Sequence, residues 1–313
     1  MMSMAHYCLG ILLAPLLLGI INRVKAKFAG RRGRPYFQLY YDLAKLLRKS
    51  AVYSETTSPV FRLGPLIGLG GVLAALLFVP LGGTPALAHF TGDFILAAYL
   101  LALGRFMTML AALDTGSAFE GMGASREAVY SALAEPVLLL VFVPLGMTVK
   151  SFTLSSMLAP FTPYAWEHYW PVLVLVGTAL FILLLTENCR IPVDDPNTHL
   201  ELTMIHEVMI LDHGGVDLAI IEFASALKLW FFCAVIVGSS FPDVTLFVAG
   251  TPAGEIFQGP LVSLLLALCG IFLIAVLVGV TESVMARLKL TKVPALLTLA
   301  GALTALACLF CLR

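Results

Sequence analysis

The sequence has little charge and lacks the motifs of soluble enzymes. Charged residues make up 12% of the 313 residues, against about 25% in ordinary soluble domains. There is no Gly-rich phosphate loop, no HExxH metal motif, no nucleophile triad and no internal repeat. The six cysteines show no disulfide or cluster framework, and Cys308 and Cys311 lie in an apolar run where cysteine is ordinary packing. Without a long hydrophilic domain, any soluble catalytic machinery must belong to partner chains.

Long apolar runs take the place of charge. Hydrophobic residues make up 60% of the chain, and eight runs suit the roughly 17 to 25 residues of a membrane-spanning helix. No basic residue precedes the first run, so we expect a membrane helix and not a cleaved signal. The sequence therefore predicts an all-α integral membrane protein with eight transmembrane helices in one membrane domain, residues 1–313. The predicted spans are Tyr7–Ile21, Leu63–Leu81, Phe94–Leu113, Val129–Val149, Pro171–Leu185, Leu218–Gly238, Pro260–Val280 and Val293–Leu312.

Lysine and arginine are distributed unevenly over the connections between these spans. Of the 19, 15 lie in connections one, three, five and seven. Only Lys150 and Arg313 lie on the other side, and Arg105 and Lys228 lie within spans. Because positively charged connections stay in the cytoplasm, the odd-numbered connections are predicted to be cytoplasmic and both termini to face outward.

The first connection predicts a helix of a different kind. Aromatic and aliphatic residues recur at helical spacing between Pro35 and Lys49, with polar residues between them. This pattern indicates an amphipathic helix at the cytoplasmic interface, with Pro35 in its first turn. Such a helix binds either anionic lipid or a protein partner, and the sequence leaves both open.

The fifth connection concentrates ionisable groups. The stretch Glu187–Lys228 holds eight acidic residues and three histidines. Pro192 and Pro196 interrupt any helix that continues from the preceding span, and a second helix is predicted over Thr198–Leu211. One side of that helix would carry His199, Thr203, His206 and Glu207. The plain alternative is a loop whose charges are merely solvated.

Carboxylates and histidines between a cytoplasmic connection and the bilayer interior are the groups that proton transfer requires. Arg105 must find an acid within the bundle, either as a structural ion pair or as part of a proton path. Neither Glu135 nor Glu187 has a cation four residues away on its own helix, so both are expected to exchange protons near neutral pH. The candidates for a proton path are Glu135, Glu187, Asp194, Glu201, Glu207, Asp212, Glu222, Lys228, Arg105, Asp114, Glu120 and Glu127. A metal site formed by His199, His206 and Asp212 is disfavoured, because Asp212 lies well round the helix from the histidines.

Three motifs lie near the cytoplasmic ends of the predicted spans. They are Arg31-Arg32-Gly33 followed by Gln38, Asp42 and Lys45; Gly123-Ala-Ser-Arg126-Glu127 followed by Glu135; and Glu187-Asn-Cys-Arg190-Ile-Pro192-Val-Asp194 followed by Glu201-Leu202. With the eight spans, they resemble the membrane subunit that bears the quinone chamber in respiratory complex I. The chain resembles more closely the relative of that subunit in group 4 nickel–iron hydrogenases, such as formate hydrogenlyase and hydrogenase-4.

The resemblance implies a role within a larger complex in the cytoplasmic membrane of a prokaryote. Glu135 would be a buried glutamate of the family's proton path. The chain would dock soluble partners through Arg31, Arg32, Gln38, Asp42, Lys45, Arg126, Arg190, His199 and His206. The partners implied are hydrogenase large and small subunits, an iron–sulfur subunit and antiporter-like membrane subunits, with no nucleic acid. Iron–sulfur clusters and a nickel–iron centre would belong to those subunits, and no cofactor or metal is expected in this chain.

Two departures from the quinone-using members favour the hydrogenase branch. Where those members have two further glutamates in the fifth connection, this chain has Asn197 and His199. A quinone-binding subunit of an NADH:quinone oxidoreductase is nevertheless one alternative function. Another is a stand-alone proton- or cation-coupled transporter, although the paired broken helices expected of such a protein are missing.

Overall fold

A computed structural model describes residues 2–159, 163–194, 204–240 and 260–312 of the chain. Within these ranges the chain is helical, and the one pairing of extended backbone is an isolated bridge between Leu81 and Thr84. The helices are α1 (Met2–Phe28), α2 (Gln38–Leu46), α3 (Pro59–Leu76), α4 (Asp93–Asp114), α5 (Ala118–Val149), α6 (Leu154–Met157), α7 (Pro163–Glu187), α8 (His206–Met209), α9 (Gly215–Ser240), α12 (Pro260–Val284), the 3-10 helix η1 (Leu290–Lys292) and α13 (Val293–Cys311).

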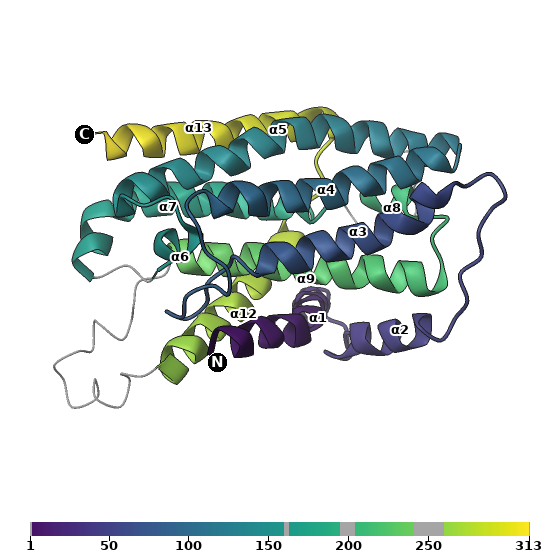
Figure 1. The fold of residues 1–313 in the computed structure, drawn as a ribbon, viewed down its shortest axis with the longest axis horizontal. Coiled ribbons are helices and arrows are strands. Elements are labelled where there is room, and N and C mark those ends of the chain that lie inside the picture. The colour runs from purple at the N-terminus through teal and green to yellow at the C-terminus, as the bar shows by residue number, and fades with distance from the viewer. Residues whose placement is uncertain (1, 160–162, 195–203, 241–259, 313) are drawn as a thin grey trace.

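Eight of these helices are long and apolar enough to cross a membrane, namely α1, α3, α4, α5, α7, α9, α12 and the stretch from η1 through α13. This confirms the eight predicted spans. The short helices α2 and α8 lie at one end of the bundle, and both termini lie towards the other (Figure 1). An even number of spans puts the two termini on the same side, as the charge distribution predicts.

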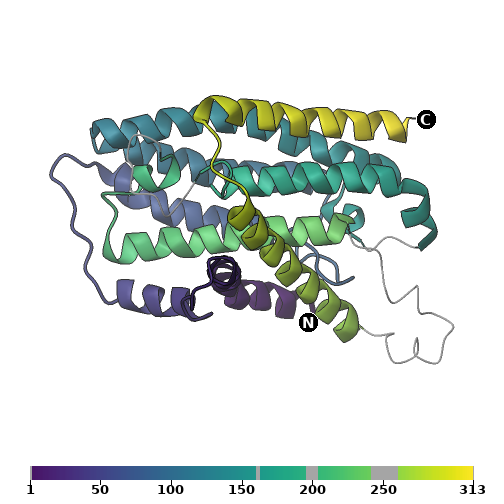
Figure 2. The same cartoon turned by 180° about the vertical axis from the view of Figure 1, so that it is seen from behind.

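The spans pack around α9, which is the most buried of them. About two thirds of the apolar window of α9 is buried, against half or less in every other span. Helix α3 packs on α4, α13 packs on α5 and α7, and α12 crosses α1 at a steep tilt (Figure 2). Because α9 contacts α1, α3, α7 and α12, ionisable side chains on α9 face other helices and not lipid.

Glycines bring α3 and α4 close together. A Cβ at Gly71 would lie 2.7 Å from the carbonyl oxygen of Leu100, and a Cβ at Gly104 would lie 3.2 Å from the Cα of Gly68. Larger side chains would push the two helices apart. The neighbouring residue Arg105 is therefore buried within the bundle.

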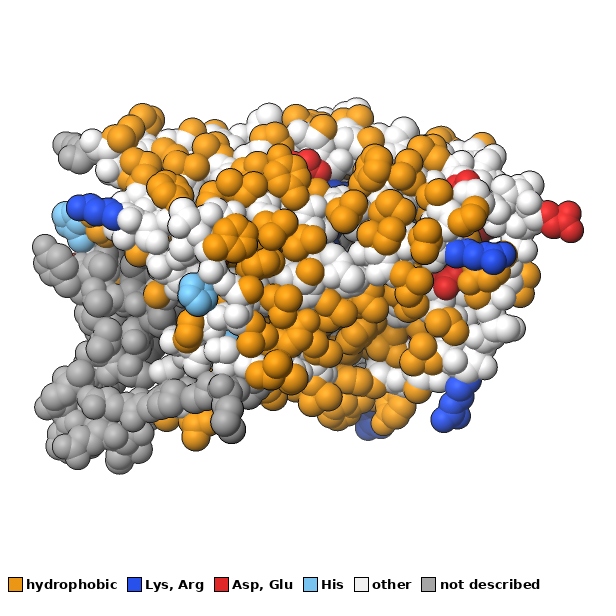
Figure 3. Space-filling model, viewed as in Figure 1, with side chains coloured by type: hydrophobic (Ala, Val, Ile, Leu, Met, Phe, Trp, Pro, Cys, Tyr) orange, Lys and Arg blue, Asp and Glu red, His pale blue; other side chains and the backbone are white. Residues whose placement is uncertain are grey.

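Apolar side chains cover most of the outer surface of the spans. Figure 3 shows this for the face over α3 and α4, where charged side chains gather mainly at the end that carries α2 and α8. Exposed residues of α3 and α4 include Leu66, Tyr99, Leu103 and Phe106. A surface of this kind suits a lipid environment or neighbouring membrane helices.

Some predicted boundaries are wrong. Helix α5 begins at Ala118, so Glu120 and Glu127 lie on a helix that extends beyond the apolar run from which the span was predicted. Helix α2 is shorter than predicted, because it begins at Gln38 and not at Pro35. The Gln38 N–H donates to the carbonyl of Pro35 in a turn that precedes the helix. The helix predicted over Thr198–Leu211 lies partly outside the described residues, and in residues 204–211 only His206–Met209 is helical.

Candidate functional site

Four charged side chains from four helices form a continuous row inside the bundle, here called the central ion row. The Arg105 guanidinium on α4 contacts Glu135 of α5 at 2.9 Å and also pairs with Glu187 of α7. The Lys228 ammonium on α9 lies 2.9 Å from the second carboxylate oxygen of Glu187. Each charge therefore has an opposite neighbour, which makes burial of the row tolerable.

Burial differs along the central ion row. The Glu187 side chain is 1% exposed and that of Arg105 is 7% exposed, whereas that of Glu135 is 40% exposed. The expectation that Glu135 is a buried glutamate is therefore wrong for its side chain. The expectation that Glu135 and Glu187 exchange protons near neutral pH rested on the lack of a cation on their own helices. Its premise is wrong for both acids, because Arg105 pairs with each of them and Lys228 also pairs with Glu187, all from other helices. The expectation that Arg105 and Lys228 find acids on other helices is confirmed.

A second set of ion pairs holds the start of the fifth connection. Glu282, near the end of α12, has a fully buried side chain that lies 2.7 Å from Lys25 of α1 and 3.5 Å from Arg190. Arg190 follows Cys189, whose φ of 48° turns the backbone sharply after α7. The chain is thereby attached to both α1 and α12 directly after Glu187.

Asp194 anchors the same connection on its other side. Its carboxylate lies 3.0 Å from the Arg287 guanidinium and accepts the backbone N–H groups of Ile205 and His206 at 3.0 and 3.2 Å. The N–H of Leu288 also donates to the carbonyl of Pro192 at 2.8 Å. The seventh connection, residues 285–292, thus fastens the fifth.

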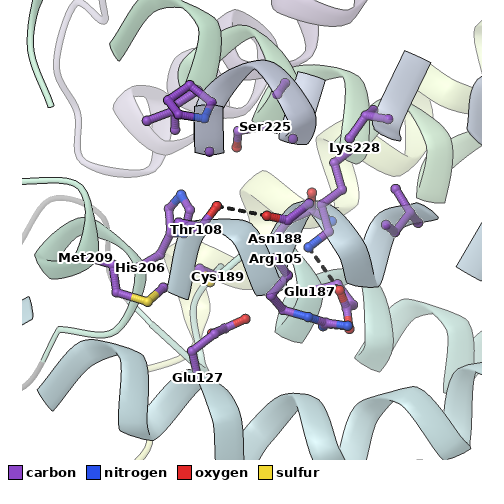
Figure 4. Close-up of a pocket in the computed structure, with 18 residues that line it drawn as sticks. Arg105, Thr108, Glu127, Glu187, Asn188, Cys189, His206, Met209, Ser225 and Lys228 are labelled. Atoms are coloured by element: carbon purple, nitrogen blue, oxygen red, sulfur yellow. Dashed lines mark hydrogen bonds and ion pairs between the residues drawn. The ribbon is translucent and has the colours of Figure 1, made fainter. Parts of the chain in front are cut away.

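A small cavity of about 90 Å³ lies against the central ion row. Arg105, Glu187 and Lys228 line it, together with Glu127 and Thr108 (Figure 4). Glu127 comes from α5, about two turns of helix before Glu135, and carries no ion pair among the described residues. The cavity therefore places a carboxylate without a paired cation beside the buried row.

A large cavity of about 300 Å³ lies between α1, α2, α9 and the fifth connection. Its charged lining residues are Arg34, Asp42, Arg190, Asp194, Glu207 and Glu222. Gln38 also lines it and donates to Asp42 at 2.9 Å. Polar walls of this extent suit water and exchangeable protons better than an apolar ligand.

Burial shifts the proton affinity of groups in the fifth connection. Burial, followed by repulsion from Glu222 and Asp194, raises the pKa of Glu207 to about 7. Burial likewise lowers the pKa of His206 to about 4, so its ring is neutral at pH 7. Burial raises the pKa of the Cys189 thiol well above its ordinary value. Glu207 is therefore suited to exchange protons near neutral pH.

The structure brings together some of the predicted proton-path residues and separates others. Asp114 accepts the N–H of Ser58 at 2.6 Å, and Glu120 accepts the N–H of Asp212 at 3.2 Å. None of the three residues Asp114, Glu120 and Asp212 lines either cavity. Asp114 and Glu120 instead accept hydrogen bonds from backbone N–H groups. Their place in a proton path stays a prediction. Glu201 lies outside the described residues.

Of the residues predicted to dock partners, Arg31, Arg32 and Lys45 are exposed. Arg190 is buried in its pair with Glu282, which does not fit a docking role. The side chains of Gln38, Asp42 and His206 line the large cavity, and Arg126 donates to the carbonyl of Met204 at 2.7 Å. His199 lies outside the described residues. Within them, no group of three His, Cys, Asp or Glu residues is placed to hold a metal ion.

The sequence reasoning missed the residues that fasten the fifth connection. The charge distribution counts Lys25 and Arg287 among the cations of the odd-numbered connections, and it assigns no role to Glu282. Glu282 is the one charged residue of α12. An acid inside an otherwise apolar span is the signal by which it could have been found.

Comparison with known proteins places the chain in a family. The family profile described as NADH dehydrogenase matches residues 1–312. The chain belongs to this NADH dehydrogenase family. This confirms the resemblance that the three motifs carry.

Two relatives in the family come from Escherichia coli (strain K12). Hydrogenase-4 component C is 32% identical over 312 residues, covering 98% of this chain and 94% of the relative. Formate hydrogenlyase subunit 4 is 30% identical over 284 residues, covering 90% and 88%. Among solved structures, a chain of the membrane-bound sulfane sulfur reductase, an archaeal respiratory membrane complex, matches with a TM-score of 0.81. It is 19% identical and covers 99% of this chain and 98% of its own length, which establishes a shared fold.

Proposed function

We propose that this chain is the membrane-embedded proton-path subunit of a hydrogenase complex. It anchors a soluble redox arm at the end of the bundle that carries α2 and α8, and it links redox chemistry there to proton movement across the bilayer. The electron carriers, iron–sulfur clusters and a nickel–iron centre, belong to the soluble partners in this proposal.

One observation carries the proposal: the central ion row runs across four helices and lines the small cavity, which adjoins a large cavity lined by further acids. A buried row of alternating charges is costly to build for stability alone, and in a membrane protein such groups commonly mark ion paths. The relatives named hydrogenase-4 component C and formate hydrogenlyase subunit 4 supply the type of complex.

The geometry supports a path in two stages. Glu207 and Glu222 line the large cavity, which lies beside the fifth connection, and Glu127 and Glu187 line the small cavity deeper in the bundle. A change in the charge of a redox partner at the fifth connection would alter the field at Glu207 and Asp194 first. Because each charge in the central ion row is paired with the next, a proton gained by an acid at one end changes the electrostatic interaction of every pair along the row.

The proposed setting follows from the distribution of charge. We place the chain in the cytoplasmic membrane of a prokaryote, with both termini outside and connections one, three, five and seven in the cytoplasm. Exposed Arg31, Arg32 and Lys45 lie at the end that would meet soluble partners. The apolar outer faces of the spans would meet lipid or antiporter-like membrane subunits.

The test replaces Glu135 by Gln in the assembled complex. Its side chain is 40% exposed and Arg105 keeps Glu187 as a partner, so assembly should survive. Glu127→Gln is a second variant, since no ion pair among the described residues depends on it. Native gels would report assembly, and hydrogen turnover and proton translocation would be measured on the same membrane vesicles.

We expect proton translocation to fall at least about tenfold in both variants, and Glu135→Asp to retain more activity than Glu135→Gln. The matched control is Glu167→Gln, an exposed acid at the opposite end of the bundle, which should leave translocation unchanged. Assembled Glu135→Gln and Glu127→Gln complexes with undiminished translocation would contradict the proposal.

A quinone-binding role is the second candidate, and the volume of the large cavity favours it. About 300 Å³ is at the lower end of the range for small-molecule sites. Against it, six charged side chains line that cavity, which is a poor setting for an apolar ring and tail. Stoichiometric quinone in the purified complex, with inhibition by quinone-site inhibitors at low concentration, would favour this candidate.

A further inference from the structure

The two cavities share a wall. The residues that line both are Asn188, Cys189, His206, Ile221 and Ser225. Glu207 and Glu222 lie on the large-cavity side of this wall, and Glu127 and Glu187 lie on the small-cavity side. A proton that moves between these two groups of acids must therefore pass a wall residue or a gap beside one.

The wall residues differ in their ability to carry a proton. The amide of Asn188, the hydroxyl of Ser225 and the alkyl chain of Ile221 do not titrate in the physiological range. The Cys189 thiol is held protonated, because burial raises its pKa well above the ordinary value. His206 is the remaining member, and an imidazole can accept a proton on one nitrogen and release one from the other.

The position of His206 is fixed from behind. Its backbone N–H and that of Ile205 donate to Asp194, and Asp194 is held by Arg287 at 3.0 Å. His206 lines the small cavity together with Met209, Cys189 and Thr108 (Figure 4). The loop is therefore held through backbone N–H groups and not through the ring nitrogens of His206.

We propose that His206 is the proton carrier between the large and the small cavity. The neutral ring accepts a proton on one nitrogen from the large-cavity side, and the N–H on the other nitrogen gives its proton to the small-cavity side. Only N–H bonds form and break, and a flip of the ring about its Cβ–Cγ bond turns the unprotonated nitrogen back to the large-cavity side before the next transfer. This inference rests on the proposed function, since it names the group that joins the two stages of the path.

The charges around His206 come from several elements. On the fifth connection and α8 they are Arg190, Asp194 and Glu207; on the first connection and α2 they are Arg34 and Asp42; and on the spans they are Arg105, Glu127, Glu187, Glu222 and Lys228. Burial and the nearby cations Lys228 and Arg190 lower the pKa of His206 to about 4. At pH 7 the ring is therefore neutral, and it carries a second proton only transiently during a transfer.

The test uses His206→Gln and His206→Ala in the assembled complex, with native gels to report assembly. His213→Gln is the matched control: His213 is a second histidine of the same connection, it stacks on Phe61 at 3.9 Å and it lines neither cavity. Hydrogen turnover and proton translocation would be measured in vesicles with and without added free imidazole. The large cavity has room for an imidazole molecule.

We expect both His206 variants to lose at least about tenfold in proton translocation, while His213→Gln keeps it. Free imidazole should restore translocation severalfold in His206→Ala, and it should not change the wild type. A residue that only packs the wall would show no such rescue.

Three results would overturn the inference. Normal translocation in His206→Gln together with a defect in Glu127→Gln would remove His206 and leave the proposed function intact. Normal translocation in both His206→Gln and Glu127→Gln would argue against the proposed function as well. Loss of assembly in both His206 variants, or a defect that imidazole does not relieve, would assign His206 a structural role.

Discussion

The pair Glu187–Lys228 allows the energetic logic of the central ion row to be measured. Glu187→Gln removes an acid that forms ion pairs with both Arg105 and Lys228. The Lys228 side chain is only 17% exposed, so the variant leaves a largely shielded ammonium without the carboxylate that pairs with it. Breaking a buried pair in this way costs about 3–5 kcal/mol.

Lys228→Met should cost less, about 1–3 kcal/mol, because Glu187 keeps Arg105 as a partner. In the double variant neither group of the pair is charged, so the largest part of the penalty for an unpaired charge disappears. The double variant should therefore be more stable than the sum of the two single losses predicts, with a coupling of about 1–3 kcal/mol.

The free energy of unfolding of the purified chain would be measured in mixed micelles by titration with a denaturing detergent, for the wild type and the three variants. Lys49→Met, which removes an exposed cation of the first connection, is the control and should change stability by no more than about 0.5 kcal/mol. Strictly additive losses in the double variant would refute the reasoning, because they would mean that the two side chains do not interact in the folded protein.

Three further predictions concern the end of the bundle that carries α2 and α8. Glu282→Gln should destabilise the chain by about 3–5 kcal/mol and speed proteolysis of the fifth connection, because it leaves the buried Arg190 and the partly buried Lys25 without their acid. Glu207 has a pKa of about 7 in the folded protein, against 4.5 for the free group. Its contribution to stability is therefore complete below pH 4.5 and is lost as the pH rises through 7. The stability of the wild type relative to Glu207→Gln should fall between pH 4.5 and 7 and stay level above pH 7. A cysteine at Lys45, exposed on α2, should crosslink to a soluble subunit, whereas a cysteine at Glu167 should not; labelling of the Lys45 cysteine from outside the cell would contradict the topology.

The sequence predicted the spans because hydropathy depends on composition within each helix. The eight runs, and the amphipathic character of α2, needed no knowledge of tertiary contacts. Helix ends were less accessible. The start of α5 at Ala118 lies outside the apolar run, in a segment that packs on α8, so hydropathy alone could not reveal it.

The candidate site was predictable in kind but not in its pairing. That Arg105 needs an acid follows from the cost of a buried cation. That the acid is Glu187, 82 residues away, depends on how α4 and α7 pack, which no local pattern encodes. The place of His206 between two cavities depends on backbone bonds to Asp194, which also come from the tertiary fold.

The seventh connection has a consequence for how the protein is made. Asp194 and Arg190 on the fifth connection rely on Arg287 and Glu282, which emerge from the ribosome only after α9 has been synthesised. A nascent chain that ends after α9 contains every member of the central ion row, yet it lacks the fastenings that close the fifth connection over it. The proposed proton path is therefore completed late in biogenesis, and a chain that ends after α9 carries the central ion row without the ion pairs to Glu282 and Arg287.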